Sequence, residues 1–212
     1  MAKSDRIGLL ADLTQGHHTA LDIGTDHGLV LKTALDLGHI EKGIASDIGR
    51  LPLSRARKNL KGYPVDFVLS DGFSNITQAY DLVIIAGMGA FLIATILKDA
   101  PDGAITYLLQ PNDKPEALRR DLCRLGFLIE DEFVVKDRYY HVIIKAKRGL
   151  ISYSEDDLLL GPVLRFKLEA KPYYRQKKQQ LETILSKVDD ARRSTLLTMI
   201  ASYEKGLADA KD

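Results

Sequence analysis

Short runs of apolar residues alternate, over most of the chain, with stretches in which apolar residues recur every three or four positions. The runs predict five buried strands, at about 19–23, 43–46, 65–69, 82–86 and 105–109. The stretches between them predict helices at about 29–37, 52–60, 90–97 and 114–125, and another amphipathic helix precedes the first strand. Wholly apolar strands that alternate with helices are typical of a parallel sheet covered on both faces.

Two further apolar runs, at about 127–135 and 139–147, predict strands that a very short polar segment connects. Such a connection joins antiparallel strands, because a parallel crossover needs about a dozen residues or more. Two stretches follow in which apolar residues recur at the three-to-four spacing of a helix face, and we call each a helical stripe. The first starts at Leu164 and is interrupted or kinked at Pro172, and the second ends near Leu207. The stripes predict an antiparallel helical hairpin.

These elements predict an α/β fold in two domains. A Rossmann-like sheet of five parallel strands with a terminal antiparallel hairpin occupies residues 1–150, and a coiled-coil-like helical domain occupies residues 151–212. No apolar run approaches the roughly 18 residues that cross a bilayer, and we recognise no signal peptide, so we expect a cytoplasmic protein without a membrane partner. The five histidines lack the spacing of metal ligands, so no metal is expected. We take a monomer as the simplest expectation for the oligomeric state.

Acids and glycines follow the predicted parallel strands. Ligands of open α/β sheets bind at these carboxyl ends, so we expect a ligand site there. The alternative for any single acid is that it caps the next helix. The first turn reads Asp22-Ile23-Gly24-Thr25-Asp26-His27-Gly28, which lacks the middle glycine of the dinucleotide motif and carries two acids that would repel a pyrophosphate. A positively charged cofactor without phosphates fits better, and S-adenosylmethionine is the prediction.

The predicted cofactor-binding residues are the acids and glycines of this edge together with two apolar neighbours. Asp47, after the second strand, has the position of an acid that binds ribose hydroxyls, and Asp71 could accept from an adenine amino group. The full set is Asp22, Gly24, Asp26, Gly28, Asp47, Ile48, Asp71, Gly72, Gly87, Met88 and Gly89.

The runs 21–28, 71–72, 85–89 and 109–112 resemble the bacterial tRNA adenine-22 N1-methyltransferase family, over nearly the whole chain. The terminal antiparallel hairpin is the layout of class I methyltransferases, whereas a dehydrogenase would continue with a sixth parallel strand. The resemblance implies S-adenosylmethionine-dependent methylation of N1 of adenine 22 in tRNA. The chain departs from the family at two places. At Ala90 the family usually has a second pair of small residues, and around Arg50 the helix of the family usually begins Gly-Pro-Leu.

The fourth-strand end, Ala86-Gly87-Met88-Gly89, differs from the Asn/Asp-Pro-Pro-Tyr/Phe cluster common in enzymes that methylate exocyclic amines. The absence of that cluster favours, as the target of methylation, a nitrogen with a free lone pair, such as adenine N1. A nearby acid would stabilise the developing cation or accept an N6 proton. Asp26 is the first catalytic candidate and His27 the second; the alternative for Asp26 is that it only shapes the turn.

Adenine N1 lies on the Watson–Crick edge, so the base must be exposed before transfer, and phosphate contacts must hold the RNA. Basic residues outnumber acidic ones after Gly161, although the net charge is only +1. The excess is consistent with a polyanion partner and equally with a solvated helical surface. Tyr139 and Tyr140 either stack on a base or pack on the sheet. The predicted RNA contacts are Arg6, Arg50, Asn112, Arg165, Lys167, Lys171, Arg175, Lys177, Lys178, Arg192 and Arg193, with Lys3 near the pocket mouth.

Two other functions stay open at this point. The same cofactor site could serve another RNA or a small molecule, although no inserted lid is apparent. A non-catalytic RNA-binding protein that keeps the fold is the alternative from another class.

Overall fold

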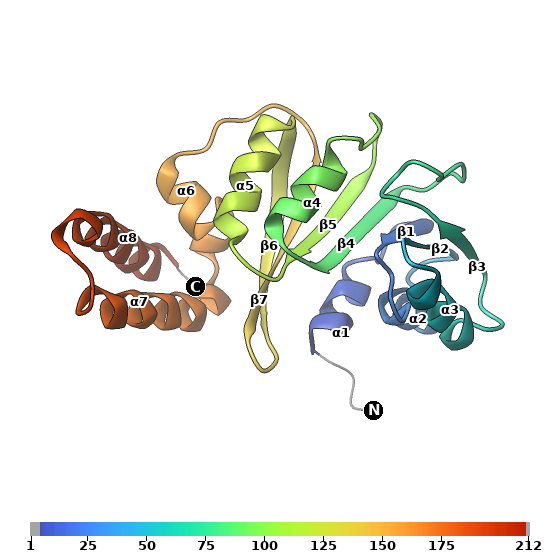
Figure 1. Cartoon of the computed structure of the whole chain (residues 1–212), viewed down its shortest axis with the longest axis horizontal. Helices are drawn as coiled ribbons and strands as arrows, with labels where there is room; N and C mark the ends of the chain where they lie inside the picture. The colour runs from blue at the N-terminus through green and yellow to red at the C-terminus, as the bar shows by residue number, and fades with distance from the viewer. Residues whose placement is uncertain (1–4, 211–212) are drawn as a thin grey trace.

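A computed structural model of the chain describes residues 5–210, except for the side chains at 190 and 191; Lys3 lies outside this range. The seven strands form one sheet (Figure 1). The strands are β1 (Thr19–Ile23), β2 (Lys42–Asp47), β3 (Val65–Leu69), β4 (Leu82–Met88), β5 (Thr106–Pro111), β6 (Phe127–Lys136) and β7 (Tyr140–Arg148). The helices of the sheet region are α1 (Asp5–Asp12), α2 (Leu29–Asp36), α3 (Arg50–Asn59), α4 (Ala90–Leu97) and α5 (Pro115–Arg124).

The strand order is β3-β2-β1-β4-β5-β7-β6, and β7 is antiparallel to both of its neighbours while the other pairings are parallel. The predicted Rossmann-like sheet with a terminal antiparallel hairpin is therefore confirmed. The order reverses between β1 and β4, and such a switch point opens a crevice at the carboxyl ends of the strands.

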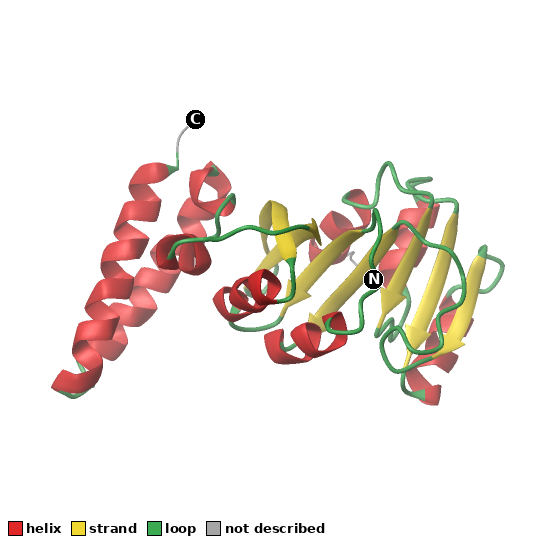
Figure 2. Ribbon diagram, turned by 90° about the horizontal axis from the view of Figure 1, so that it is seen from above, coloured by secondary structure: helices red, strands yellow, loops and turns green. Residues whose placement is uncertain are grey.

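Helices cover both faces of the sheet, as Figures 1 and 2 show. Along β4, Val83 and Ile85 face the core under α4 and α5, whereas Leu82 and Ile84 face the core under α1, α2 and α3. Side chains alternate between the faces of a strand, so a run that is apolar at every position can fill both cores. The apolar runs therefore encode a three-layer arrangement.

The C-terminal segment forms a helical hairpin with a different start from the predicted one. α6 (Glu155–Leu160) was not predicted, although Ser154 and Asp157 form a capping box at its first turn. Two short 3₁₀ turns, Leu164–Phe166 and Leu168–Ala170, precede α7 (Lys171–Leu185), and α8 (Asp190–Asp209) returns beside it. Of the two predicted effects of Pro172, the structure shows the interruption and not the kink, because a new helix begins at Lys171 and this proline lies in its first turn, where no amide hydrogen bond is lost.

A buried ion pair joins this segment to the sheet. The Arg119 Nε of α5 donates to Glu132 Oε1 of β6 at 2.7 Å, and both side chains are fully buried. Glu132 Oε2 accepts from the Val163 and Leu164 amides at 3.1 Å each, and Arg119 Nη1 donates to the carbonyls that end α6. Gly161 turns between these groups at φ 101°, and a Cβ there would lie 2.4 Å from Glu132 Oε2. The helical segment and the sheet consequently share one core.

Replacing Glu132 with Ala should lower the free energy of unfolding by about 3–5 kcal/mol, because Arg119 would be left charged and buried. Chemical denaturation measures this loss. Glu130→Ala on the same strand is the matched control, since Glu130 pairs with Lys147 at 2.6 Å near the surface and should cost at most about 1 kcal/mol. Equal losses in the two variants would contradict the assigned role of Glu132.

Candidate active site

A cavity of about 450 Å³ lies at the switch point between β1 and β4. Asp22, the first turn, Asp47 and the end of β4 line it from the sheet, and α1 and the start of α2 close its sides. A larger cavity of about 640 Å³ lies where the strands begin, against Lys42 and Val65 among others. We assign the ligand to the smaller one, because ligands of open α/β sheets bind at the carboxyl ends.

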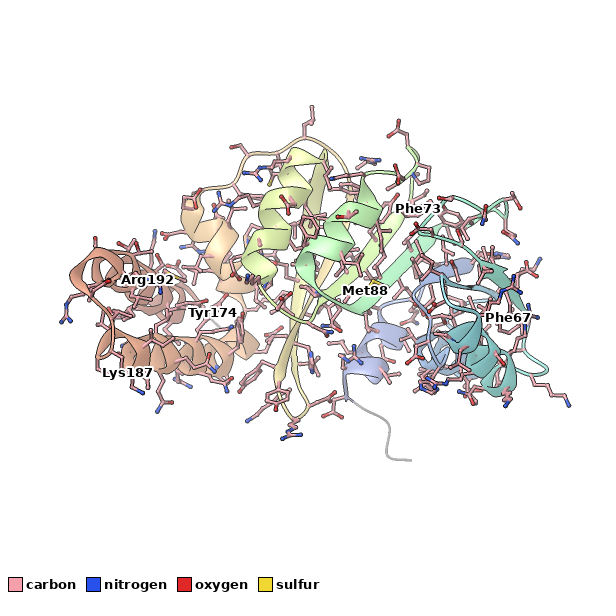
Figure 3. The ribbon with its side chains drawn as sticks, viewed as in Figure 1. Phe67, Phe73, Met88, Tyr174, Lys187 and Arg192 are labelled. Atoms are coloured by element: carbon pink, nitrogen blue, oxygen red, sulfur yellow. The ribbon has the colours of Figure 1, made fainter. Side chains whose placement is uncertain are left out.

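The first turn is held in a backbone conformation that few residues adopt. Gly24 and Asp26 have φ of 76° and 44°, in the left-handed region, which aspartate tolerates better than most residues. A Cβ on Gly24 would lie 2.0 Å from the Met88 Cε, so the turn and the end of β4 are in close contact. Figure 3 shows Met88 where β4 ends, beside α1. A larger residue than glycine at position 24 would displace the end of the Met88 side chain and would be strained at a φ of 76°.

Asp22 is the buried acid of the cavity. The Thr25 hydroxyl donates to its Oδ2 at 2.8 Å, and Asp47 lies close enough to interact electrostatically. Burial raises the pKa of Asp22 to about 6; the Thr25 bond opposes this shift and the charge of Asp47 adds to it. A cation in the cavity would relieve both the burial and the repulsion, so this wall is suited to a positively charged ligand.

The two predicted catalytic residues lie on the outer part of the same turn. Asp26 is half exposed, with its Oδ1 3.7 Å from Arg55 Nη1 and its Oδ2 3.5 Å from His27 Nε2. Both side chains line the cavity. Ion pairs this exposed add little stability, so the carboxylate can exchange its partners for a ligand. Asp26 therefore both shapes the turn and faces the cavity.

A β-bulge at Gly87 forms the opposite wall. The pairing with β5 skips from Ala86 to Met88, and Gly87 has φ of 77°. The freed amide of Gly87 donates to the Gln110 side chain at 3.1 Å, and its carbonyl accepts from Asn112 Nδ2 at 2.6 Å. Bulges commonly re-aim backbone beside active sites. Asn112 thus supports the bulge, and its contact with RNA stays a prediction.

Helix α1 contributes a wall that the sequence did not assign to the cofactor site. Ile7 and Leu10 line the cavity, and Arg6 Nη1 donates to the Gln110 Oε1 at 2.5 Å. Arg6 was expected only among the RNA contacts. Its position beside the bulge depends on a side chain more than a hundred positions away, and no local pattern signals such a contact.

Several predicted cofactor residues do not line the cavity. Gly28 precedes α2 and packs against Leu60, and Gly89 precedes α4. Ile48 is 71% exposed just after Asp47. Asp71 and Gly72 lie in the loop after β3, whose Ser70 amide donates to the Asp47 carbonyl at 3.0 Å. Gly28, Ile48 and Gly89 each follow directly after a residue that lines the cavity, and the contact of all five residues with a ligand stays a prediction.

Three of the predicted phosphate contacts are already bound within the protein. The Arg165 guanidinium is buried and binds Asp157 at 2.8 Å as well as Asp209. Lys167 binds Asp131 at 2.6 Å and lies 4.1 Å from the centre of the Phe133 ring, and Lys178 binds Glu204 at 2.7 Å. The predicted contact of Arg165 is wrong, because its guanidinium is buried. Lys167 and Lys178 each have an acidic partner that a phosphate would have to displace, and the sequence pattern did not reveal these partners.

The remaining cations are more accessible. Arg175, Arg192 and Arg193 are exposed, Lys171 and Lys177 are half-buried, and Arg50 is exposed at the start of α3. Arg192 lies toward the end of the helical hairpin that is farthest from the sheet (Figure 3). Two groups of cations therefore remain, one near the cavity and one on the helical hairpin.

Over residues 5–210, no cluster of three or more His, Cys, Asp or Glu side chains could hold a metal ion. Within the same range, no helix combines the length and apolar character of a membrane span.

Residues 3–143 match the family described as a methyltransferase domain. A Mycoplasma pneumoniae protein provisionally named a tRNA methyltransferase is 30% identical over 169 residues, 75% of this chain and 79% of that protein. The Bacillus subtilis tRNA (adenine(22)-N(1))-methyltransferase is 29% identical over 178 residues, 76% of this chain and 74% of that enzyme.

Solved structures agree with the sequence matches. A Streptococcus pneumoniae protein crystallised with S-adenosyl-L-methionine superimposes with a TM-score of 0.84 at 26% identity, covering 96% of this chain and 99% of its own. The M. capricolum TrmK structure with S-adenosyl-homocysteine shows the same fold over the full length of both chains, with a TM-score of 0.84. The chain belongs to the methyltransferase domain family and, within it, to the bacterial tRNA (adenine-22-N1)-methyltransferase family.

Proposed function

We propose that this protein transfers the methyl group of S-adenosylmethionine to N1 of adenine 22 in tRNA, in the cytoplasm. The observation that carries the proposal is the first turn, where a buried acid and an exposed acid line one cavity at the switch point. Relatives with the same fold bind this cofactor or its product, and one carries the activity in its name.

The residues around the cavity fit the cofactor chemically. S-adenosylmethionine supplies an electrophilic methyl group on a cationic sulfur. Asp22 and Asp26 would favour its positive groups, and Asp47 would accept from ribose hydroxyls, in addition to the Gly49 amide that its Oδ1 accepts from at 2.8 Å. The positive φ of Gly24 and its close contact with Met88 disfavour a bulky side chain in this wall.

Adenine N1 carries a lone pair, so the protein need not remove a proton before the attack. The ring becomes cationic as the N1–methyl bond forms, and a carboxylate near it stabilises that charge. Asp26 is the residue we assign to this task, because it lines the cavity and is half exposed. His27 beside it is the second candidate, as an acceptor for an N6 proton.

Incubation with labelled cofactor and unmodified tRNA transcripts, followed by mapping of the methylated nucleotide, tests the activity. We expect 1-methyladenine at position 22, and Asp26→Asn should lower kcat by about 10²–10⁴-fold if its charge is used in the transition state. The affinity for the cofactor in the same variant separates a lost charge from a collapsed turn. A methyl group on an exocyclic amine would overturn the assigned chemistry.

Cofactor affinity should rise by about tenfold between pH 5 and pH 7, because Asp22 with a pKa of about 6 must lose its proton before it can attract a cation. Titration calorimetry across this range measures the effect. The ligand-free protein should show the opposite trend in stability. A raised pKa stabilises the fold most below the unfolded value of 3.8, and this contribution is lost as the pH rises through about 6.

Asp22→Asn is the variant that should flatten both profiles. Adenosine, which lacks the ammonium and sulfonium groups, is the ligand control and should bind without this pH dependence. An unchanged profile in the variant would remove Asp22 from cation binding.

Replacing Arg192 and Arg193 with Gln should weaken tRNA binding and reduce the slope of log affinity against log salt by about 1 for each phosphate that the variant no longer binds. Lys178→Gln is the matched control on the same hairpin, because Glu204 already binds this lysine, and we expect its salt slope to equal that of the unmodified protein. If the Arg192 and Arg193 double variant also keeps the full slope, the helical hairpin does not bind the RNA backbone.

A further inference from the structure

The β6–β7 hairpin extends past the edge of the sheet that holds the cavity. Leu109 of β5 pairs with Ile144 of β7, and β5 ends at Pro111. The residues of β7 before Val142 therefore continue beyond β5. Figure 1 shows the tip of the hairpin projecting from the sheet on the side of α1. We call residues 136–140 the hairpin tip.

A short series of hydrogen bonds connects the hairpin tip to the cavity wall. The backbone amide of Arg6 donates to Asp137 Oδ1 at 3.3 Å, and the Arg6 guanidinium donates to Gln110. Gln110 in turn holds the amide of Gly87, which lines the cavity. The tip is consequently fixed beside the mouth of the cavity.

The two tyrosines of the hairpin tip have different surroundings. Tyr140 packs edge-on against Tyr173, with ring centroids 5.8 Å apart, and so belongs to the core that joins the sheet to α7. Tyr139 is 61% exposed, and the Arg138 guanidinium lies 5.3 Å from its ring centroid. Lys136 and Arg138 are exposed as well. The Lys136 ammonium lies 5.3 Å from the centroid of the Tyr140 ring. An exposed ring with cations on nearby residues of the same hairpin tip is the chemistry that holds unpaired nucleotides, through stacking and phosphate contacts.

We propose that Tyr139 stacks on an unpaired nucleotide of the tRNA next to the adenine that enters the cavity, while Arg138 and Lys136 contact the adjoining phosphates. This inference rests on the proposed tRNA substrate and adds a residue to its recognition. Adenine N1 becomes accessible only when the base leaves its stack, and a ring beside the cavity mouth replaces the stacking that the neighbouring nucleotide loses.

The test compares Tyr139→Ala with Tyr139→Phe in the full chain, using tRNA transcripts and S-adenosylmethionine. We expect Tyr139→Ala to raise the KM for tRNA by about tenfold, the loss typical of one stacked base, with kcat and cofactor affinity unchanged. Tyr139→Phe keeps the ring and should match the unmodified protein. Leu150→Ala is the control for the loss of an exposed apolar side chain, since Leu150 follows the other end of β7 and is 91% exposed.

A KM for tRNA in Tyr139→Ala that equals that of the unmodified protein would overturn the inference, and so would an equal loss in Tyr139→Phe. Direct tRNA binding by the same variants separates this result from a failure of the proposed function. If the unmodified protein forms no 1-methyladenine, the proposed function fails. The stacking role is then kept if Tyr139→Ala still lowers the affinity for tRNA. It is removed if Tyr139→Ala binds tRNA as tightly as the unmodified protein.

Discussion

The buried ion pair between Arg119 and Glu132 fixes how the C-terminal helices meet the sheet. Two charges without water are costly to bury, and they are tolerated because each also binds backbone groups of the C-terminal segment. These bonds are directional, so they favour one placement of the segment over the alternatives that a purely apolar contact would allow. Gly161 is required at the same place, because any Cβ would meet both charged groups.

Three of the backbone positions with positive φ lie at the ligand site. Gly24, Asp26 and Gly87 all have positive φ, and all three lie at or just after the end of a parallel strand. At these points the backbone must leave the regular ladder and expose amides and side chains to a cavity. The walls support one another across it, through the contact of Gly24 with Met88 and through the two side chains that hold Gly87. Of the three, only Asp26 is a non-glycine residue held at positive φ, and such strain is typical of functional sites.

The sheet and the first turn could be predicted because their signals are local. An apolar run, a glycine spacing and an acid after a strand are all visible within a few residues. The sequence could not predict in this way which basic side chains bind acids within the protein and which stay exposed. Arg165 resembles its exposed neighbours in sequence, but its partner Asp209 lies 44 positions away. Asn112 likewise gained its role from a bulge on another strand. Helix α6 did carry a local signal, the Ser154 capping box, in a segment without a long apolar stripe.

The placement of the remaining cations bears on the size of the substrate. Arg6 lines the cavity, and Arg50 begins α3, shortly after the carboxyl end of β2. Arg192 lies near the far end of the helical hairpin (Figure 3), which is at the opposite end of the long axis from α3 (Figure 1). A small molecule in the cavity would touch only the first group, so the second group would have no function in binding it. A folded RNA is long enough to contact both at once, and phosphate contacts distant from the reacting base position it without reading its sequence. The internal ion pairs of Arg165 and Lys167 strengthen this interpretation, because they hold the helical hairpin in place and leave the outer cations free to bind.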